Sequence, residues 1–456
     1  MSTNDRFETA FSATSPYTPG RLLDTLSELN GDTLLSLESV HKAGLEDIQA
    51  VEDNLKQYIE DDEDEDGDTR EGATARIRLE IIRRRKLELE LVRLALGQVT
   101  SDVDGSTRIH GIEEELHDYY SPALFKLALQ KKLEILANTK TPGELDMGKA
   151  MLLEELESYL ASIDTEEEVE LEQPKPETLK AIGDWLYSQF GDVLDEIDTF
   201  EGDELDAQQL VSFLNLAIVT TPALRENGWV AKAIRRNKQA ITVFASTREV
   251  VVSDQRRISK ADAKKVTVHE VFGHALRSAI AETNGDEIGV TGTAGYGEFE
   301  ESLMIALEQC LEGKYDSSRG IDHYVAVGLV ETLGLPRDKV AQLFRTMSIF
   351  GETKNQDKLT DDHIRGANIK TIKQISRTFA GLTDVDDGIA RRTDLKYLHG
   401  LNNSWKILNA IVEAGQVDEG MRWMLSTKSN PYNKLDQELM AQYSEMPSSI
   451  KKALAV

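Results

Sequence analysis

The chain of 456 residues contains a single cysteine, Cys310. One cysteine cannot form an intramolecular disulfide, and it excludes a zinc site made of several thiolates. No basic segment followed by an apolar one opens the chain, so no secretory signal is expected. Runs of about 18 consecutive apolar residues, the kind that spans a membrane, are also missing. These absences predict a soluble, cytoplasmic protein.

Basic residues are scarce relative to acidic ones: 52 Lys and Arg stand against 81 Asp and Glu, giving a net charge of -29. Such a surface repels nucleic-acid phosphates and anionic lipid, so neither nucleic acid nor a membrane is an expected partner. The hydrophobic content of 40% is ordinary for a globular protein. The length predicts two or three structural units.

Apolar residues at helical spacing dominate the first hundred positions, in 21–60 and again in 73–96. An acidic run at 60–68 separates the two, which predicts a helical hairpin after a mobile N-terminal tail. Turn-forming residues at 100–108 suggest a linker. We therefore predict an N-terminal helical region, 1–105, followed by a larger domain, 106–456.

The acidic run offers an alternative as a calcium loop. Asp62, Asp64, Asp66 and Gly67 fit the start of an EF-hand loop. The twelfth position should be a bidentate glutamate and is Ala73. A solvated run of charge is the preferred interpretation, and calcium stays the minor alternative.

Past the linker, the pattern predicts a mainly α domain with a small sheet. Helical spacing recurs in the following segments: 112–138, 143–163, 176–194 and 207–219. Two β-branched runs, 241–246 and 249–253, predict neighbouring strands. From Ser259, a plausible N-cap, helices are expected again, with loops near 283–298, 313–321 and 351–366.

The helix after the strands carries the stretch His269-Glu270-Val-Phe-Gly-His274. Two imidazoles and a carboxylate so close together can supply two metal ligands and a general base. In the familiar zinc-protease motif the histidines are four residues apart and share one helix face. The spacing of five here separates them by about 140° on a regular helix. A π-helical bulge would restore a common face, and Gly273 removes a side chain where that bulge would crowd.

A third ligand is needed, and the best candidates open a helix in 295–309. Periodicity places Glu300 on the apolar stripe of this helix and Glu301 to one side, which favours Glu300. Carboxylates are also common at helix starts because the helix dipole stabilises them, so neither has to be a ligand.

The first of these elements resembles the microtubule-associated tyrosine carboxypeptidase (MATCAP) family and its bacterial relatives. That family carries a His-Glu-x-x-x-His helix followed by an arginine, which His269, Glu270, His274 and Arg277 match. The resemblance implies a zincin-like metallopeptidase core that releases a C-terminal tyrosine or phenylalanine.

The second element resembles the helix of that family that opens Glu/Gln-Glu-Gly-Leu-Ala. Residues 300–303 match it, with Ser302 in place of the glycine. The resemblance implies that Glu301 is the third zinc ligand, against the periodicity. We predict Glu301 and keep Glu300 as the alternative.

Weaker similarity extends from about residue 109 to 425 and leaves the first hundred residues outside. The stretch 394–400 is similar to the family's Lys-Asp-Leu-x-Tyr-Leu-x-Gly. Thr393 stands where the family has lysine, so no role is carried over to that position.

The predicted function is a zinc-dependent carboxypeptidase whose substrate is a peptide or protein C-terminus. Zn²⁺ would be held by His269, His274 and Glu301, and Glu270 would be the general base toward the water that the metal activates. Arg277 would bind the substrate's α-carboxylate, or else form an ordinary ion pair.

Further roles and functions stay open. Tyr296, Tyr397 and His399 are candidate donors to the oxyanion of the transition state. A non-catalytic helical interaction protein, or a zinc hydrolase with a non-peptide substrate, is the alternative function. The oligomeric state does not follow from the sequence.

Overall fold

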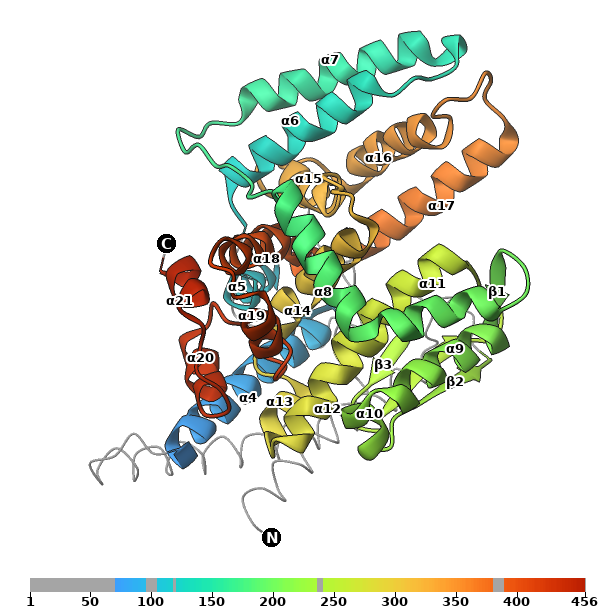
Figure 1. Cartoon of the computed structure of the whole chain (residues 1–456). Coiled ribbons are helices and arrows are strands. Elements are labelled where there is room, and N and C mark those ends of the chain that lie inside the picture. The colour runs from blue at the N-terminus through green and yellow to red at the C-terminus, as the bar shows by residue number, and fades with distance from the viewer. Residues whose placement is uncertain (1–69, 96–104, 118–119, 236–240, 380–388, 456) are drawn as a thin grey trace. The chain divides into compact units, whose positions relative to one another are not determined.

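The computed structural model describes residues 70–95, 105–117, 120–235, 241–379 and 389–455. The chain is mainly helical with a small sheet, as predicted (Figure 1). The predicted helix at 21–60 and the acidic run lie outside the described residues. Among the residues that are described, no helix is both long enough and apolar enough to cross a membrane.

The chain divides into two compact units, each made of segments far apart in sequence. The first unit takes 82–171 and 317–399 of the chain, and the second takes 172–316 and 400–455 together with the start of α4. Two helices pass from one unit into the other: α4 (Arg70–Ala95) and α18 (Lys396–Glu413). The predicted boundary near 105 stays a prediction, because most of 1–105 is not described.

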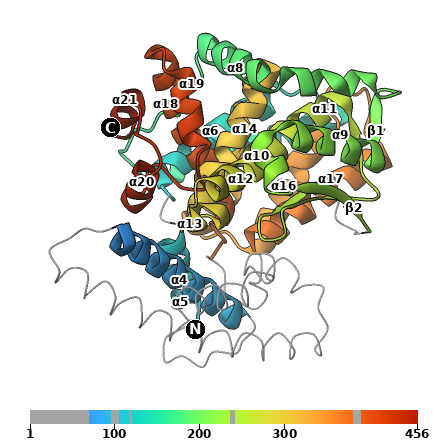
Figure 2. The same cartoon turned by 60° about the horizontal axis from the view of Figure 1, so that its bottom comes forward.

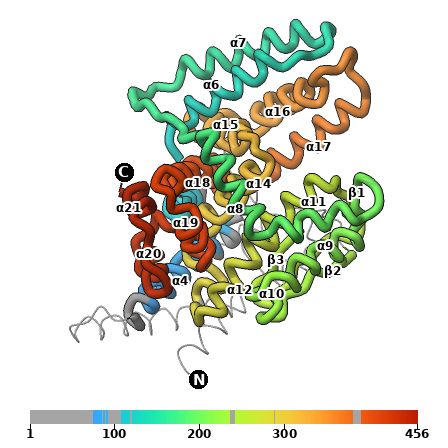
Figure 3. Tube along the Cα trace, in the orientation of Figure 1, coloured from blue at the N-terminus to red at the C-terminus, as the bar shows by residue number. Residues whose placement is uncertain are grey.

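The first unit is a set of packed helices. Its elements are α5 (Gly105–Leu116), α6 (Pro122–Asn138), η2 (Gly143–Leu145), α7 (Asp146–Ser162), α15 (Ile321–Glu331), α16 (Arg337–Glu352), α17 (Asp361–Thr378) and η5 (Thr393–Leu395). Helices α6 and α7 run side by side, and so do α16 and α17 (Figure 3). Helix α15 contacts α6, α16 and α17.

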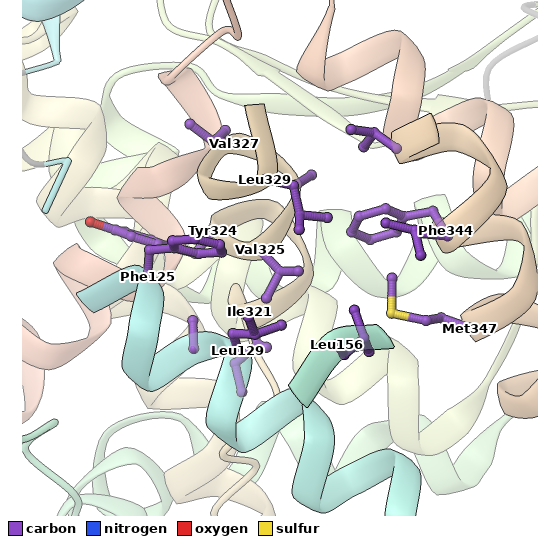
Figure 4. Close-up of a cluster of buried hydrophobic side chains, with 14 of the residues drawn as sticks. Phe125, Leu129, Leu156, Ile321, Tyr324, Val325, Val327, Leu329, Phe344 and Met347 are labelled. Carbon is purple, nitrogen blue, oxygen red and sulfur yellow. The ribbon is translucent and has the colours of Figure 1, made fainter. Parts of the chain in front are cut away.

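The core of this unit lies around α15 (Figure 4). Phe125 of α6, Tyr324 of α15 and Phe344 of α16 are among its buried aromatic residues. Leu156 brings α7 into the same cluster. Each helix therefore buries one apolar face, as the sequence pattern predicts.

One predicted boundary in this unit is wrong. Residues 105–108 of the expected linker belong to α5, because Ile109, Ile112 and Leu116 make it amphipathic and pack with Leu91 and Ile389. The helical segment expected over 112–138 comprises the end of α5 and all of α6.

A cap separates them. The hydroxyl of Ser121 accepts the N–H of Leu124, and Pro122 follows as the first residue of α6. Serine at the N-cap and proline at N1 are a helix start signal.

The second unit contains the sheet and the predicted metal-binding helix. Its helical elements are α8 (Pro176–Asp195), η3 (Glu196–Thr199), α9 (Ala207–Thr220), α10 (Pro222–Glu226), α11 (Lys260–Val266), η4 (Thr267–Ala275), α12 (Leu276–Thr283), α13 (Glu287–Thr291), α14 (Tyr296–Glu312), α19 (Val417–Met424), α20 (Lys434–Ala441) and α21 (Ser448–Leu454). Helix α9 packs against β2 (Val230–Ile234), and α10 contacts α9 and α12 (Figure 2). The loops expected at 283–298 and 351–366 are shorter, because helices occupy part of each.

The sheet of this unit has β4 (Glu249–Ser253) in its centre. It pairs in parallel with β2 and antiparallel with β3 (Thr242–Phe244). Val250, Val251 and Val252 are buried on it. The two predicted strands are confirmed as β3 and β4, whereas β2 was not foreseen.

A second, two-stranded ribbon fixes the start of the metal-binding helix. Strands β1 (Glu204–Asp206) and β5 (Arg257–Ser259) pair antiparallel, with Leu205 opposite Ile258. Ser259 ends β5 and caps α11, since its hydroxyl accepts the N–H of Asp262. The predicted N-cap is confirmed.

Replacing Gly183 by alanine is expected to destabilise the second unit. A Cβ at Gly183 in α8 would lie 2.6 Å from the carbonyl oxygen of Cys310 in α14, and a backbone atom cannot turn aside. We expect the free energy of unfolding to fall by about 1–3 kcal/mol in urea titrations. Gly148→Ala is the control: its Cβ meets nothing within 4 Å, so it should stabilise α7 by about 0.5–1 kcal/mol. Equal stability of both variants would contradict the close packing of α8 on α14.

Candidate metal centre

The helix that carries both histidines has the predicted bulge. It begins as α11, continues as the π-helical segment η4 over Thr267–Ala275, and returns to an α-helix in α12. The wider turn brings residues five apart onto one face, and the His269 and His274 ring centres lie 4.9 Å apart. The prediction of a π-helical distortion is therefore confirmed.

Gly273 lies where α14 approaches the π-helical segment, and the predicted relief of crowding at the bulge stays a prediction. A Cβ at this position would lie 1.8 Å from Sδ of Met304 in α14. The glycine therefore allows α14 to approach the π-helical segment closely. On the same helix, Phe272 stacks on Phe190 of α8, with ring centres 3.8 Å apart. Both contacts fix the helix relative to its neighbours in the second unit.

The three predicted ligands lie together. Glu301 Oε2 is 3.8 Å from His269 Nε2, and Glu301 Oε1 is 3.6 Å from His274 Nε2. Their ligand atoms all lie within 4.8 Å of one another. The side chains of His269 and Glu301 are 15% and 29% exposed, so the group is reached from solvent. Two imidazole nitrogens and one carboxylate so arranged can hold a divalent metal ion.

A second carboxylate stands behind each imidazole. His269 Nδ1 is 2.7 Å from Glu308 Oε1, and His274 Nδ1 is 2.8 Å from Glu300 Oε2. When each Nδ1–H donates to its carboxylate, each Nε2 keeps its lone pair directed toward Glu301. Metal-binding histidines are usually fixed in this way. The four contacts together orient both rings toward one point.

Glu308 was not singled out from the sequence. It lies two helical turns after Glu301 on α14, and it is flanked by the buried Leu307 and Gln309. A carboxylate seven residues after a ligand shares its helix face. That spacing is the signal that could have identified it.

Glu300 is buried, as its place on the apolar stripe predicts, with only 3% of its surface exposed. The atoms that face both Nε2 nitrogens nevertheless belong to Glu301. Periodicity indicates which side of α14 faces the core, whereas the histidines approach from its flank. Burial was therefore a poor criterion for choosing between the two glutamates.

The acidic surroundings change the pKa values of this group. Burial by itself would lower the pKa of His269, but the hydrogen bond to Glu308 and the charges of Glu270, Glu301 and Glu308 raise it to about 9. Burial would raise the pKa of Glu300, yet the charges of Lys428, His274 and Arg277 and the hydrogen bond from His274 hold it far below its usual value. The site is thus built to accept positive charge.

Arg277 is completely buried, with 0% exposure. Its Nη1 donates to Glu300 Oε1 at 3.3 Å, and its Nη2 donates to the carbonyl oxygen of Ser429 at 3.1 Å. This placement favours the alternative of an ion pair over direct contact with a substrate. Through Glu300, Arg277 supports His274.

The remaining predicted residues are the general base and the three candidate donors to the oxyanion. Glu270 follows His269 on the π-helical segment, is half-buried, and its charge acts on both His269 and Lys428. Tyr296 opens α14 within the second unit. Tyr397 belongs to the first unit, where its ring lies 5.6 Å from that of His323. His399 belongs to the first unit as well.

Asp436 anchors the segment that follows α19. It is 2% exposed, and its Oδ2 accepts the hydroxyl of Thr293 and the N–H of Asn430. Burial raises the pKa of this carboxyl from 3.8 to about 7, although both hydrogen bonds and the charge of Arg277 oppose the shift. At pH values between 3.8 and about 7, Asp436 therefore holds a proton in the folded protein, whereas the unfolded chain has released it.

A pH dependence of stability follows from that proton. Between pH 3.8 and about 7 the folded state binds more protons at Asp436 than the unfolded state, so this group's contribution to stability falls as the pH rises. Asp436→Asn is expected to flatten that part of the profile, measured as unfolding free energy against pH. Asp322→Asn, at an exposed residue that pairs with Lys132, is the control. An unchanged slope in Asp436→Asn would show that Asp436 is ionised in the folded protein.

No protein-family model, curated protein or solved structure matches this chain. Its function therefore has to be inferred from the geometry of the described residues.

Proposed function

We propose that the chain is a zinc-dependent peptidase with a zincin-like core. One observation carries this proposal: His269 and His274 turn their Nε2 atoms toward Glu301, while Glu308 and Glu300 hold their Nδ1 atoms. The sheet lies just before this helix in sequence and contacts it through β3 and β4.

The donor set fits zinc. Two imidazoles and one carboxylate are the protein ligands of a class of catalytic zinc sites, in which a fourth position stays open. The partial exposure of Glu301 and His269 supports such an opening. When bound, zinc would supply a Lewis acid that acidifies water and polarises a carbonyl group.

The chain's own residues would transfer the proton and hold the metal ligands in place. Glu270 would accept a proton from the attacking water and deliver it to the leaving amine. Glu308 and Glu300 would keep the histidine rings in place. Arg277 would keep Glu300 charged and oriented. The buried Cys310 takes no part, and we propose a cytoplasmic location in keeping with its free thiol.

The finer proposal is a carboxypeptidase that releases a C-terminal aromatic residue. It rests on the resemblance to the MATCAP family in the His269–Arg277 and 300–303 stretches. We keep it separate from the peptidase proposal, because the two are tested by different substrates.

The test uses the full-length chain loaded with zinc and matched peptides that end in phenylalanine, as the free acid and as the amide. Release of phenylalanine from the acid alone would support the carboxypeptidase. Cleavage of both at internal bonds would support a peptidase of another specificity. Failure to cleave any peptide would contradict the proposed function and favour the helical interaction protein.

A further inference from the structure

Two exposed apolar patches lie on helices of the first unit. One is formed by Met147 and Met151 of α7, and the other by Ile369 and Ile372 of α17. Between 61% and 77% of the surface of each of these residues is exposed, whereas no other large hydrophobic residue among those described exceeds 51%. Single exposed apolar residues are ordinary. Apolar residues that gather in patches indicate a surface that binds another protein.

Each patch belongs to a longer stripe along one face of its helix. Positions that are four, three and four residues apart share a helix face, and two exposed sets have this spacing. The α7 stripe consists of Met147, Met151, Glu154 and Ser158. The α17 stripe consists of Arg365, Ile369, Ile372 and Ser376. Both stripes thus combine two apolar residues with one charged residue and a serine.

The α7 stripe lies in acidic surroundings. The exposed charged residues of α7, which the structure describes throughout, are Asp146, Glu154 and Glu157. Lys149, the basic residue of this helix, donates instead to the carbonyl oxygens of Ala137 and Thr139. This face therefore favours a partner surface that is basic.

The α17 stripe lies in basic surroundings. Beyond the first turn of α17, which the structure describes throughout, the exposed charged residues are Arg365, Lys370 and Lys373. Arg365 forms an ion pair with Asp362, and Lys370 forms one with Glu352. Because exposed pairs of this kind are weak, both basic residues can exchange partners at little cost. In a chain with a net charge of -29, this face therefore favours an acidic partner surface.

The two stripes match when the helices run antiparallel. In each stripe, the charged residue and the farther apolar residue are seven positions apart, which is about 10.5 Å of helix. The charged residue is C-terminal to the apolar pair on α7 and N-terminal to it on α17. An antiparallel contact therefore brings together Met147 with Ile372, Met151 with Ile369, and Glu154 with Arg365.

The shape of the α7 face also suits an apolar side chain. A groove of about 510 Å³ lies between α7 and α16, and Met151, Leu152 and Leu343 are among the residues that line it. A side chain of the size of Ile369 can enter this groove. The flexible side chain of Met151 can adapt to the shape of the group that enters.

The two stripes are kept apart within one copy of the chain, because α16 lies between α7 and α17 and contacts both (Figure 1). We propose that the chain self-associates through the first unit, with the α7 stripe of one copy on the α17 stripe of a second copy. This inference does not depend on the proposed peptidase function. Two such contacts related by a twofold axis close a dimer. Each contact is smaller than the interface of about 1,600 Å² that is typical of stable complexes, so the association is expected to be weak.

Analytical ultracentrifugation of the full-length chain tests the contact at about 1 to 100 µM protein, the range in which weak complexes form. The average mass should rise above the 50.9 kDa of one chain as the concentration increases. Glu154→Arg and Arg365→Glu each place like charges opposite one another and should weaken the association by about 10-fold or more. An equimolar mixture of these two variants should recover the association, since every contact between them again joins opposite charges.

Glu157→Arg is the matched control, because Glu157 is exposed on α7 but lies about 80° around the helix from Met147; it should leave the association nearly unchanged. Ile369→Ser should weaken the association, whereas Val219→Ser, at an exposed valine of α9, should not. Thermal melting verifies that each variant is folded. A wild-type chain that keeps the mass of one chain at the highest concentration would overturn the proposal. So would a mixture of the two charge variants that does not recover the association.

Discussion

Glu270→Gln is expected to lower kcat by about 10²- to 10⁴-fold, the usual contribution of a general base, while zinc stays bound. Glutamine has the size of glutamate but cannot accept the proton of the attacking water. Glu270 is not one of the three residues that converge on the metal position, so the ligands remain. The measurement is peptide hydrolysis together with zinc content for the same preparation.

Glu282→Gln is the control on the same continuous helix. Glu282 forms an ion pair with Arg248 at the surface, and removing such a pair should cost little stability and leave kcat unchanged. Should Glu270→Gln keep wild-type kcat with zinc in place, Glu270 would not be the base.

Removing the ligands is expected to have the second large effect. His269→Ala, His274→Ala and Glu301→Ala should each abolish stoichiometric zinc binding, because each takes away one of three protein donors. Glu308→Gln keeps the donors but weakens the support of His269, and should lower zinc affinity by about 10- to 100-fold. Titration against a competing chelator measures the zinc affinity of the ligand variants and of Glu308→Gln on one scale.

Substitutions at Glu300 test whether Glu300 or Glu301 of α14 is the third zinc ligand. Its removal would leave the buried charges of Arg277 and Lys428 without their shared partner, which is strongly destabilising, by about 3–5 kcal/mol. Glu300→Gln should therefore lower the melting temperature more than the intrinsic zinc affinity of the folded protein. Full zinc binding by Glu301→Ala, combined with its loss in a folded Glu300→Gln, would instead make Glu300 the third ligand.

The metal-binding helix shows how much local sequence can predict. Two histidines five apart fit one metal position only if the helix widens, and the π-helical segment over Thr267–Ala275 does so. Ser259 gives the helix start for an equally local reason, the acceptance of a backbone N–H. A structural feature that depends only on neighbouring residues can therefore be predicted from the sequence.

Contacts between distant segments could not be predicted in this way. Strand β2 has β-branched residues only at its two ends, Val230 and Ile234, and its pairing with β4 decides its conformation. Glu308 contacts His269, and Lys428 contacts Glu300. Neither contact could be predicted from the local sequence. Periodicity could say that Glu300 is buried, but the position of the histidines relative to α14 depends on tertiary packing at Gly273 and Met304. Each of the two units is made of segments far apart in sequence. A search for linkers along the chain could not identify such units, for the same reason.

The central claim is that His269, His274 and Glu301 hold one zinc ion. The most direct measurement is elemental mass spectrometry of the full-length chain, purified without added metal and again after incubation with a modest excess of zinc and removal of the unbound metal. The account predicts close to one zinc per chain, lost in His269→Ala and in Glu301→Ala. Absence of zinc from the wild-type chain even after incubation would contradict the metal centre and the peptidase proposed from it.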